Sequence, residues 1–520
     1  MRERRKMNRK TVSGMMLTLL LIGTLTLAFN VQSVKAVGTI YIRPDGSIDP
    51  STAPIARDGD IYTLTNNIFS DADGIVIERD NMTLDGAGHT VQGSGSRMGI
   101  YLSGRNNVTI RNMEIKAFYD GVLLLEDSSG NNISGNSVTG NRRLGVLVDD
   151  SFNNSISRNS ISNNELGIRL QYSSHNILSA NNITKNELEG IYLHSSLNNT
   201  LRSNRMAWNK RNFGVSSWVG VGGFVNDVDV TNTVDDKPII YWINKRDMTV
   251  PVDAGYVALI DCTRITIQNL NLTNNAHGVL LVSTTNSTIT ENDMVSNYVG
   301  YGIFSWFSSF NTISGNSIKH NNYGIYLWDC SNHNSISENN ITDNRYGIYL
   351  WSSSKSNTFC HNNLIDNIVQ VRSTYGALNI WDDGYPSGGN YWSDYEERYP
   401  DAIELDGSGL WDTPYFIDEN NQDNYPLMEP WTPLPRTINE LKTEIEELGS
   451  EGEIDNQGIV RSLIAKLNVA QKLIDNGKTD QAKKILNAFI NEVQAQSEKH
   501  ISPDAAELLI ESAEHILSHL

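Results

Sequence analysis

A glycine followed by a short aliphatic strand recurs along most of the chain. After each glycine the aliphatic side chains take the first and third positions, as in Gly324-Ile-Tyr-Leu-Trp328. Alternation with a period of two over so few residues is typical of a strand with one buried face. The steps between successive repeat glycines are 22–25 residues in ten of eleven cases, which predicts a regular coil of that length. The repeat glycines are Gly74, Gly99, Gly121, Gly145, Gly167, Gly190, Gly214, Gly255, Gly278, Gly302, Gly324 and Gly347.

A second pattern, Asn-x-Ile-Ser/Thr, follows each strand ten or twelve residues later and often occurs twice, as at Asn334 and Asn339. Three short strands per coil can bury a core only when coils stack in parallel, about 4.8 Å apart. Asn tolerates the left-handed turn conformation, and stacked Asn amides can hydrogen-bond from coil to coil. The chain is therefore predicted to be an all-β right-handed parallel β-helix solenoid, followed by a small all-α helical bundle. The Leu-x-x-Leu-x-Leu pattern of a leucine-rich repeat is absent.

The predicted domains follow from where the period starts and stops. An insertion at about 215–254 interrupts the repeats, and helical spacing begins after a proline-rich segment. The expected parts are a signal peptide (1–36), an N-terminal cap (37–73), β-helix repeats (74–380), a C-terminal cap (381–430), a linker (431–436) and a helical domain (437–520).

The N-terminus and the charge bear on location and partners. Basic residues precede the apolar run 14–29, and Val34-Lys35-Ala36 is a small-residue cleavage site. We therefore expect a secreted or cell-surface protein, extracellular or in an equivalent of the periplasm. No transmembrane segment is expected to remain after cleavage. The net charge of −19 argues against a nucleic-acid partner and fits a protein that holds divalent cations.

Aromatic residues occupy the outward positions of the later coils. Because side chains alternate along a strand, these rings are predicted to face away from the aliphatic interior. An exposed apolar stripe of this size usually marks a binding site, and flat rings suit the C–H faces of sugars. The alternative is that the rings stack on one another or lie under the insertion or the helical domain. The predicted polysaccharide-binding ladder is Phe304, Trp306, Tyr326, Trp328, Tyr349 and Trp351, with Trp218 in the same column.

In the early coils the same column is polar. Paired carboxylates on neighbouring coils can perform acid–base chemistry or bind Ca²⁺, and a lyase also needs a basic partner. The weak catalytic candidates are Asp127, Asp149, Asp150, Arg169 and His194. Solvated acids at the edge of the coils are the favoured interpretation. No glycosidase or lyase signature is complete, so we expect no enzyme. If there is activity, a polysaccharide lyase or glycoside hydrolase is the expected class.

The sequence contains possible ligands for two metals, calcium and copper. Oxygen donors around glycines at Glu404, Asp406, Ser408 and Asp412 resemble a calcium loop, so a structural Ca²⁺ ion is one hypothesis. The soft copper ligands are Cys330 with His333 and Cys360 with His361. Their positions place the two cysteines on different faces, so the sequence argues against copper. The three cysteines of the chain form no disulfide framework.

Several segments give the chain a family resemblance. Over roughly 38–430 it resembles the NosD-like and CASH-type β-helix families of the pectin-lyase-like superfamily. The segments that carry this are Arg79–His89, Asp236–Trp242, Val250–Ala258, Gly389–Asp394, Asp412–Tyr415 and Tyr425–Leu427. Leu486–Ile490 and Ala505–Ile510 are similar to the FIMAH module of secreted proteins. The resemblance implies either accessory work in copper-centre maturation of nitrous oxide reductase or the binding and processing of polysaccharides.

The function expected first is non-catalytic binding of polysaccharide or surface glycan through the aromatic ladder. Copper-centre maturation comes second, and a polysaccharide lyase, hydrolase or epimerase third. A purely structural spacer at the cell surface also remains open. The ladder rests on one assumption, that the repeat glycines keep equivalent residues in register along a single rod.

Overall fold

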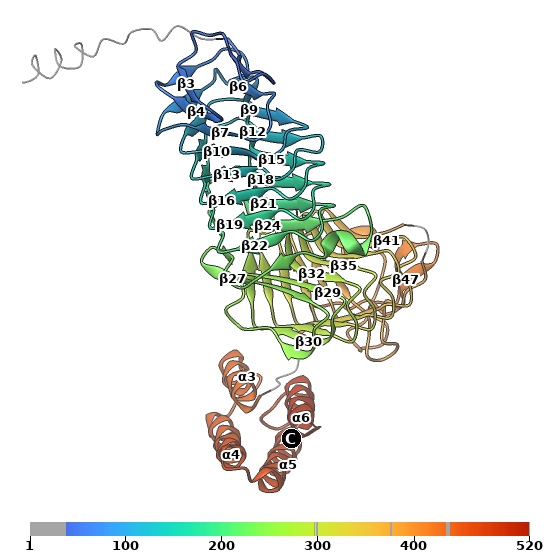
Figure 1. Cartoon of the computed structure of the whole chain (residues 1–520). Helices are drawn as coiled ribbons and strands as arrows, with labels where there is room; N and C mark the ends of the chain where they lie inside the picture. The colour runs from blue at the N-terminus through green and yellow to red at the C-terminus, as the bar shows by residue number, and fades with distance from the viewer. Residues whose placement is uncertain (1–37, 296, 298–299, 375–376, 433–436, 519) are drawn as a thin grey trace, which may run out of the picture. The chain divides into compact units, whose positions relative to one another are not determined.

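The computed structural model describes residues 38–520 except 296, 298–299, 375–376, 433–436 and 519 (Figure 1). The predicted signal peptide (1–36) and most of the predicted linker (431–436) lie outside the described residues. The chain divides into two compact units, one ending at Met428 and one spanning Glu429–Leu520. Among the described residues, no helix combines the length and apolar character that crossing a membrane requires.

The first unit is a right-handed parallel β-helix, as predicted. Its first section has three short strands in each coil, and each strand pairs in parallel with its equivalent in the next coil. The first strands of the coils are β1 (Ile40–Ile42), β6 (Ile75–Ile77), β9 (Met98–Ser103), β12 (Asp120–Leu125), β15 (Leu144–Asp149), β18 (Leu166–Gln171), β21 (Glu189–His194) and β24 (Arg211–Ser216), with β2 (Ile48–Asp49) added at the edge. The second strands are β4 (Ile61–Leu64), β7 (Met82–Asp85), β10 (Val108–Arg111), β13 (Asn132–Ser134), β16 (Ser155–Ser157), β19 (Ile177–Ser179), β22 (Thr200–Arg202) and β25 (Asp227–Val228), with β3 (Ile55–Asp58) at the edge. The third strands are β5 (Ile68–Phe69), β8 (Thr90–Gln92), β11 (Glu114–Lys116), β14 (Ser137–Thr139), β17 (Ser160–Ser162), β20 (Asn182–Thr184), β23 (Arg205–Ala207) and β26 (Thr233–Val234).

The second section repeats this arrangement. Its first strands are β27 (Lys237–Ile243), β29 (Tyr256–Ile260), β32 (His277–Val282), β35 (Tyr301–Trp306), β38 (Tyr323–Trp328), β41 (Tyr346–Trp351) and β44 (Val369–Ser373). The second strands are β28 (Arg246–Thr249), β30 (Thr263–Gln268), β33 (Thr288–Thr290), β36 (Thr312–Ser314), β39 (Ser335–Ser337) and β42 (Thr358–Cys360). The third strands are β31 (Asn271–Thr273), β34 (Asp293–Val295), β37 (Ser317–Lys319), β40 (Asn340–Thr342), β43 (Asn363–Ile365) and β45 (Tyr391–Trp392).

The repeat glycines stack directly over one another inside a section. A Cβ added to Gly121 would lie 2.4 Å from the carbonyl oxygen of Gly145, and one added to Gly145 would lie 2.6 Å from that of Gly167. Any side chain at these positions would collide with the backbone of the next coil, which explains the glycine period.

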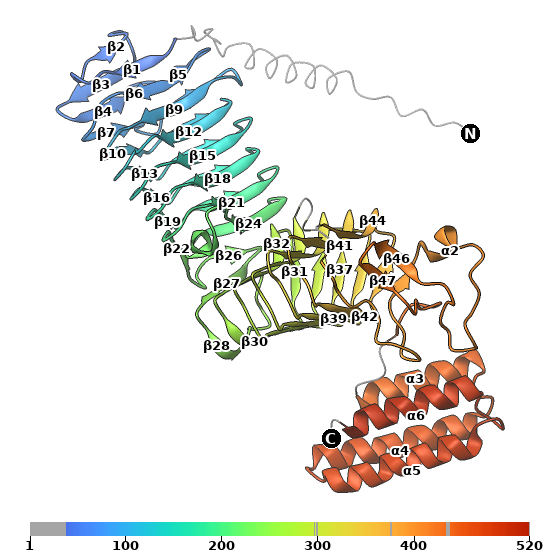
Figure 2. The same cartoon turned by 90° about the vertical axis from the view of Figure 1, so that its right-hand side faces the viewer.

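The two sections do not form the single rod that the glycine spacing predicts. Strand β26 pairs antiparallel with β27, so the sheet of third strands in the first section continues as the sheet of first strands in the second. The sheet of first strands in the first section ends at β24. Figure 2 shows the resulting change of direction between β26 and β27.

Because of this change of sheet, the outward face of β27 packs into the core of the first section. Along β27, Ile240 belongs to the core of the second section, whereas Ile239 and Tyr241 belong to the core of the first. The outward face of the first strands in the second section therefore begins as a continuation of the first section's interior.

Two repeat glycines lie out of register as a result. Gly190 is equivalent to Asn212, and Gly214 pairs with Tyr192 instead of with a glycine. The predicted place of Trp218 in the tryptophan column is therefore wrong, and Trp218 is an exposed residue beyond β24.

Buried asparagines connect the coils, as predicted. In one row the backbone amide of Asn159 donates to Oδ1 of Asn181 (3.0 Å), and Nδ2 of Asn181 donates to Oδ1 of Asn204 (2.9 Å). Each side chain also donates to a backbone carbonyl, such as Asn181 Nδ2 to Ile156 O (2.8 Å). These bonds satisfy polar groups that the turns would otherwise leave buried and unpaired.

The two ends of the β-helix differ in structure. At the N-terminus β1 already pairs in parallel with β6, so the first coil starts inside the segment 37–73 that was predicted to be only a cap. At the C-terminus lie the short helix α2 (Tyr395–Arg398) and the hairpin of β46 (Tyr415–Asp418) and β47 (Asn421–Asp423). Here the Trp392 ring stacks on that of Tyr415, with centroids 3.9 Å apart.

The second unit consists of four helices among its described residues. They are α3 (Ile438–Glu451), α4 (Gln457–Asp475), α5 (Thr479–Gln496) and α6 (Pro503–Ser518). Leu441, Leu467 and Phe489 are fully buried in their shared core. Thr437 and Glu440 form a capping box at the start of α3. This is the helical bundle predicted from the sequence.

Candidate functional site

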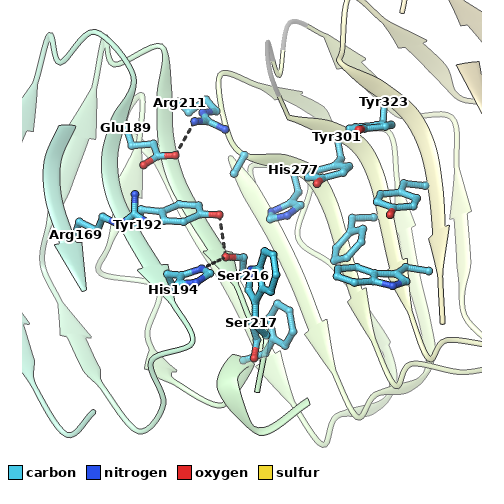
Figure 3. A pocket seen from close by; sticks show the side chains of 16 residues that line it. Arg169, Glu189, Tyr192, His194, Arg211, Ser216, Ser217, His277, Tyr301 and Tyr323 are labelled. Carbon is cyan, nitrogen blue, oxygen red and sulfur yellow. Dashed lines mark hydrogen bonds and ion pairs between the residues drawn. The ribbon is translucent and has the colours of Figure 1, made fainter. Parts of the chain in front are cut away.

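A cleft of about 420 Å³ lies where the two β-helix sections meet (Figure 3). One wall comes from the outward face of β18, β21 and β24, and the other from the outward face of β32, β35 and β38. The short helix η1 (Val221–Phe224), which belongs to the segment predicted as an insertion, contributes Phe224. The volume is in the range of small-molecule and oligomer subsites in proteins.

An ion pair lines the wall of the first section. Nη2 of Arg211 donates to Oε1 of Glu189 at 2.6 Å, between neighbouring strands β24 and β21. Burial raises the pKa of the Glu189 carboxyl above its ordinary value, although the nearby charges of Arg211 and Arg169 oppose this shift. The pair holds both side chains against the wall, because each charge offsets part of the cost of burying the other.

A hydrogen-bonded row lies next to the ion pair. The Tyr192 hydroxyl donates to Oγ of Ser216 (2.9 Å), and Oγ of Ser216 lies 2.8 Å from Nδ1 of His194 (Figure 3). Nδ1 of His194 is thus engaged with Ser216, which leaves the other ring nitrogen, Nε2, for a further partner. Burial and the charge of Arg169 lower the pKa of His194, so the ring is neutral near pH 7.

Arg169 differs from Arg211 in its contacts. It follows Leu147 and precedes Tyr192 in the outward row, and its guanidinium lies 5.7 Å from the centre of the Tyr192 ring. The Nε atoms of both arginines are buried without a hydrogen-bond partner among the described residues, but only Arg211 is ion-paired to a carboxylate there. A cation is therefore held at the cleft without a carboxylate bonded to it.

The opposite wall is aromatic. The rings of Tyr301 and Tyr323 stack with centroids 5.1 Å apart and an interplanar angle of 13°. The ring of His277 stacks on Tyr301 at 5.3 Å, and burial lowers its pKa to about 3, so it too is neutral. Rings that stack from coil to coil present mainly their edges and hydroxyl groups, rather than their faces, to a ligand.

The predicted aromatic ladder is in register but more buried than expected. Trp306 pairs with Trp328, and Trp328 with Trp351, in one column on the outward face. However, Trp306 is only 5% exposed, because it stacks on Trp328 (5.2 Å) and packs against Phe224 (5.3 Å). Phe304, Tyr326 and Tyr349 are buried as well, while Trp328 and Trp351 are half-buried. The assumption of an exposed stripe is therefore wrong for four of the six residues, since the face begins as a continuation of a core.

The structure places the five catalytic candidates in different locations. Arg169 and His194 line the cleft. Asp149 lies two coils before His194 in the same row, outside the lining, with Gln171 between them. Asp127 and Asp150 lie in turns after their strands, with positive φ. The predicted group of carboxylates with a basic partner is thus not assembled at the cleft.

The polar lining residues that the sequence analysis did not single out include Glu189, Tyr192, Arg211, Ser216 and His277. A signal for two of them exists in the sequence. Glu189 and Arg211 hold the same outward position in consecutive coils with opposite charges. The out-of-register Gly214 obscured that equivalence.

The predicted calcium loop has other hydrogen bonds. Oε1 of Glu404 accepts from the amide of Gly409 (3.0 Å), Oδ2 of Asp406 from the Tyr385 hydroxyl (2.7 Å), and Oδ1 of Asp412 from the amide of Ile403 (3.1 Å). The described residues contain no group of three or more His, Cys, Asp or Glu that could hold a metal ion. Ca²⁺ binding at Glu404, Asp406, Ser408 and Asp412 stays a prediction.

Comparison with protein families identifies the β-helix. The model of one family, described as "Periplasmic copper-binding protein (NosD)", matches residues 47–221 and 226–397. The chain belongs to the NosD family. A second family model, described as the FIMAH domain, matches residues 438–518 of this NosD-family protein. Both assignments confirm the resemblance inferred from the sequence.

Solved structures similar to this NosD-family protein are distant. The A-module of mannuronan C-5 epimerase AlgE4 from Azotobacter vinelandii is 13% identical, with 67% of this chain and 90% of that chain covered and a TM-score of 0.28. A tailspike protein of E. coli bacteriophage HK620, in complex with a pentasaccharide, is 13% identical, with 68% and 72% covered and a TM-score of 0.31. These similarities say nothing about the ligand or reaction of this chain. No curated protein matches it.

The family description makes copper the metal to test against the donors present. Cys262 is buried, with Sγ hydrogen-bonded to carbonyl oxygens of its own coils. The His333 ring stacks on Phe310 at 5.0 Å, and Nε2 of His361 lies 2.9 Å from the carbonyl oxygen of Ser387. Cys330 lies in the turn after β38, whereas Cys360 is the last residue of β42, in another sheet. In the described part of the chain, these donors do not fit a copper site.

Proposed function

We propose that this NosD-family protein is an exported, non-catalytic protein that binds polysaccharide or surface glycan in the cleft between its two β-helix sections. The observation that carries the proposal is the pairing of two unlike walls. One wall offers charged and hydrogen-bonding groups, and the other offers stacked tyrosines and Trp328. Sugars require both kinds of contact, because each ring has polar hydroxyls and apolar C–H groups.

The proposal of binding without turnover is supported by the composition of the lining. Glycoside hydrolysis uses two carboxyl groups placed about 5–10 Å apart across the bond. Among the described lining residues Glu189 is the one carboxylate, and it is paired with Arg211. The described lining therefore lacks the second carboxyl group that such hydrolysis uses.

Retention of the full-length mature protein on immobilised polysaccharides tests the proposal, and the chain supplies a matched pair of variants. Trp328 and Trp351 are equivalent residues on adjacent strands and both are half-buried, but only Trp328 lines the cleft. Trp328→Ala should abolish retention, and Trp351→Ala should keep it. Equal loss in both variants would favour a ladder along the coils instead of the cleft. Equal retention in both would refute the aromatic wall as a binding surface.

The family match favours copper-centre maturation as a second candidate function. It ranks second because the described residues include no group of three or more His, Cys, Asp or Glu side chains that could hold a metal ion.

A further inference from the structure

We infer that the glycan bound in this cleft is anionic, and that Arg169 pairs with its carboxylate or sulfate group. This inference rests on the proposed function and specifies the chemical class of its ligand. It follows from the balance of charge in the cleft, from the contacts of Arg169, and from the neutral donors beside it.

The charge of the cleft is opposite in sign to that of the chain. The lining holds the cations Arg169 and Arg211 and the anion Glu189. His194 and His277 are neutral near pH 7, because burial lowers the pKa of each. One positive charge therefore remains, in a protein whose net charge is −19. An anionic polymer repelled by most of the surface would be attracted here.

The excess cation is Arg169, because Arg211 already bonds to Glu189 at 2.6 Å. The Arg169 Nε is buried and lacks a hydrogen-bond partner among the described residues. Arg169 lines the cleft and is only half-buried as a whole, so an anion in the cleft can meet its guanidinium. The planar guanidinium matches a carboxylate or sulfate with two parallel N–H···O bonds.

The surrounding groups complete a site for a sugar that carries the anion. Tyr192 lies in the next coil beside Arg169, and its hydroxyl belongs to the row through Ser216 to His194. The second ring nitrogen of a neutral His194 can donate to or accept from a sugar hydroxyl without adding charge. Tyr301 and Tyr323, on the opposite wall, supply ring edges and hydroxyls.

The test measures the affinity of the mature full-length protein for four probes. These are polygalacturonate oligosaccharides, the same oligosaccharides after reduction of their carboxyl groups, dextran sulfate and dextran. We expect binding of an acidic probe and at least ~10-fold weaker binding of its neutral counterpart, as for a charge-assisted hydrogen bond. Preference for polygalacturonate would identify a carboxylate, and preference for dextran sulfate a sulfate.

Variants tie this preference to one residue. Arg169→Gln should lower the affinity for the acidic probe at least ~10-fold and leave binding of neutral sugars unchanged. Arg158→Gln is the matched control, since Arg158 is an exposed turn residue on another face of the preceding coil. If the reduced oligosaccharides bind as tightly as the acidic ones, and Arg169→Gln changes nothing, the anionic ligand is refuted while glycan binding stands. If none of these probes or other immobilised glycans binds, the proposed function itself fails.

Discussion

The backbone amide of Ala276 donates a hydrogen bond to the carbonyl oxygen of Phe213 at 3.0 Å. This bond connects the last coil of the first section with β32 of the second, across 63 residues of sequence. His277 comes directly after Ala276, and Ser216 comes three residues after Phe213; both side chains line the cleft. The contact therefore sets the separation of the two walls.

Gly214 lies where the two sections are in close contact, and its replacement should disturb the cleft. A Cβ at Gly214 would lie 2.6 Å from Cβ of Ala276 and 2.8 Å from Cδ2 of Tyr192. We expect Gly214→Ala to lower the free energy of unfolding by about 1–3 kcal/mol, as overpacking does, and to weaken glycan retention. Chemical denaturation followed by tryptophan fluorescence measures the first effect.

Gly222→Ala provides the control for this variant, because Gly222 lies in η1 and a Cβ there would meet no atom within 4 Å. Equal stability of the two variants would show that the sections are not tightly packed at Gly214.

The asparagine rows should contribute strongly to stability. Asn181→Leu would leave the backbone amide and Nδ2 of Asn159 without Oδ1 of Asn181, and Ile156 O without Nδ2 of Asn181. Buried polar groups that lose a partner cost about 1–3 kcal/mol each, so we expect a loss of several kcal/mol in unfolding free energy.

The neighbouring residue serves as the control for that change. Asn182 is exposed on the same strand, β20, so Asn182→Leu should change the unfolding free energy by less than about 0.5 kcal/mol. Similar losses at the two positions would contradict the structural role of the rows.

Asp423 should make the stability of the β-helix unit depend on pH. This fully buried carboxylate accepts hydrogen bonds from the amide of Asn390 (2.7 Å) and from Nε1 of Trp392 (2.9 Å), and burial raises its pKa from 3.8 to about 7. Between these values the folded protein holds a proton that the unfolded chain has released. The contribution of Asp423 is thus complete below about pH 4 and is lost as the pH rises through about 7.

Asp423→Asn removes the titrating group, so its effect should vary with pH. We expect the unfolding free energy of the wild type to exceed that of the variant by more at pH 4.5 than at pH 7.5. Denaturant titrations at both pH values measure this difference. A difference that is the same at both would place the pKa of the folded carboxyl near its ordinary value.

The sequence by itself determined the coil. Its period of glycines, its alternating aliphatic positions and its repeated asparagines are local signals, and each has a direct physical cause. Gly121 and Gly145 have no room for a Cβ, and Asn181 bonds to the coils above and below. Such contacts repeat at a fixed spacing, so they can be derived without coordinates. The column of Trp306, Trp328 and Trp351 was correctly derived for the same reason.

Only the tertiary structure decided the cleft. The site depends on β27 pairing antiparallel with β26, which transfers the chain from one sheet to another and places β21 and β24 opposite the face of β35 and β38. The choice of sheet edge for the next strand depends on packing over the whole open end of a coil. The local spacing of residues does not encode this choice. Arg169 and Trp328 are far apart in the repeat pattern and belong to one site because the sheet changes direction between them.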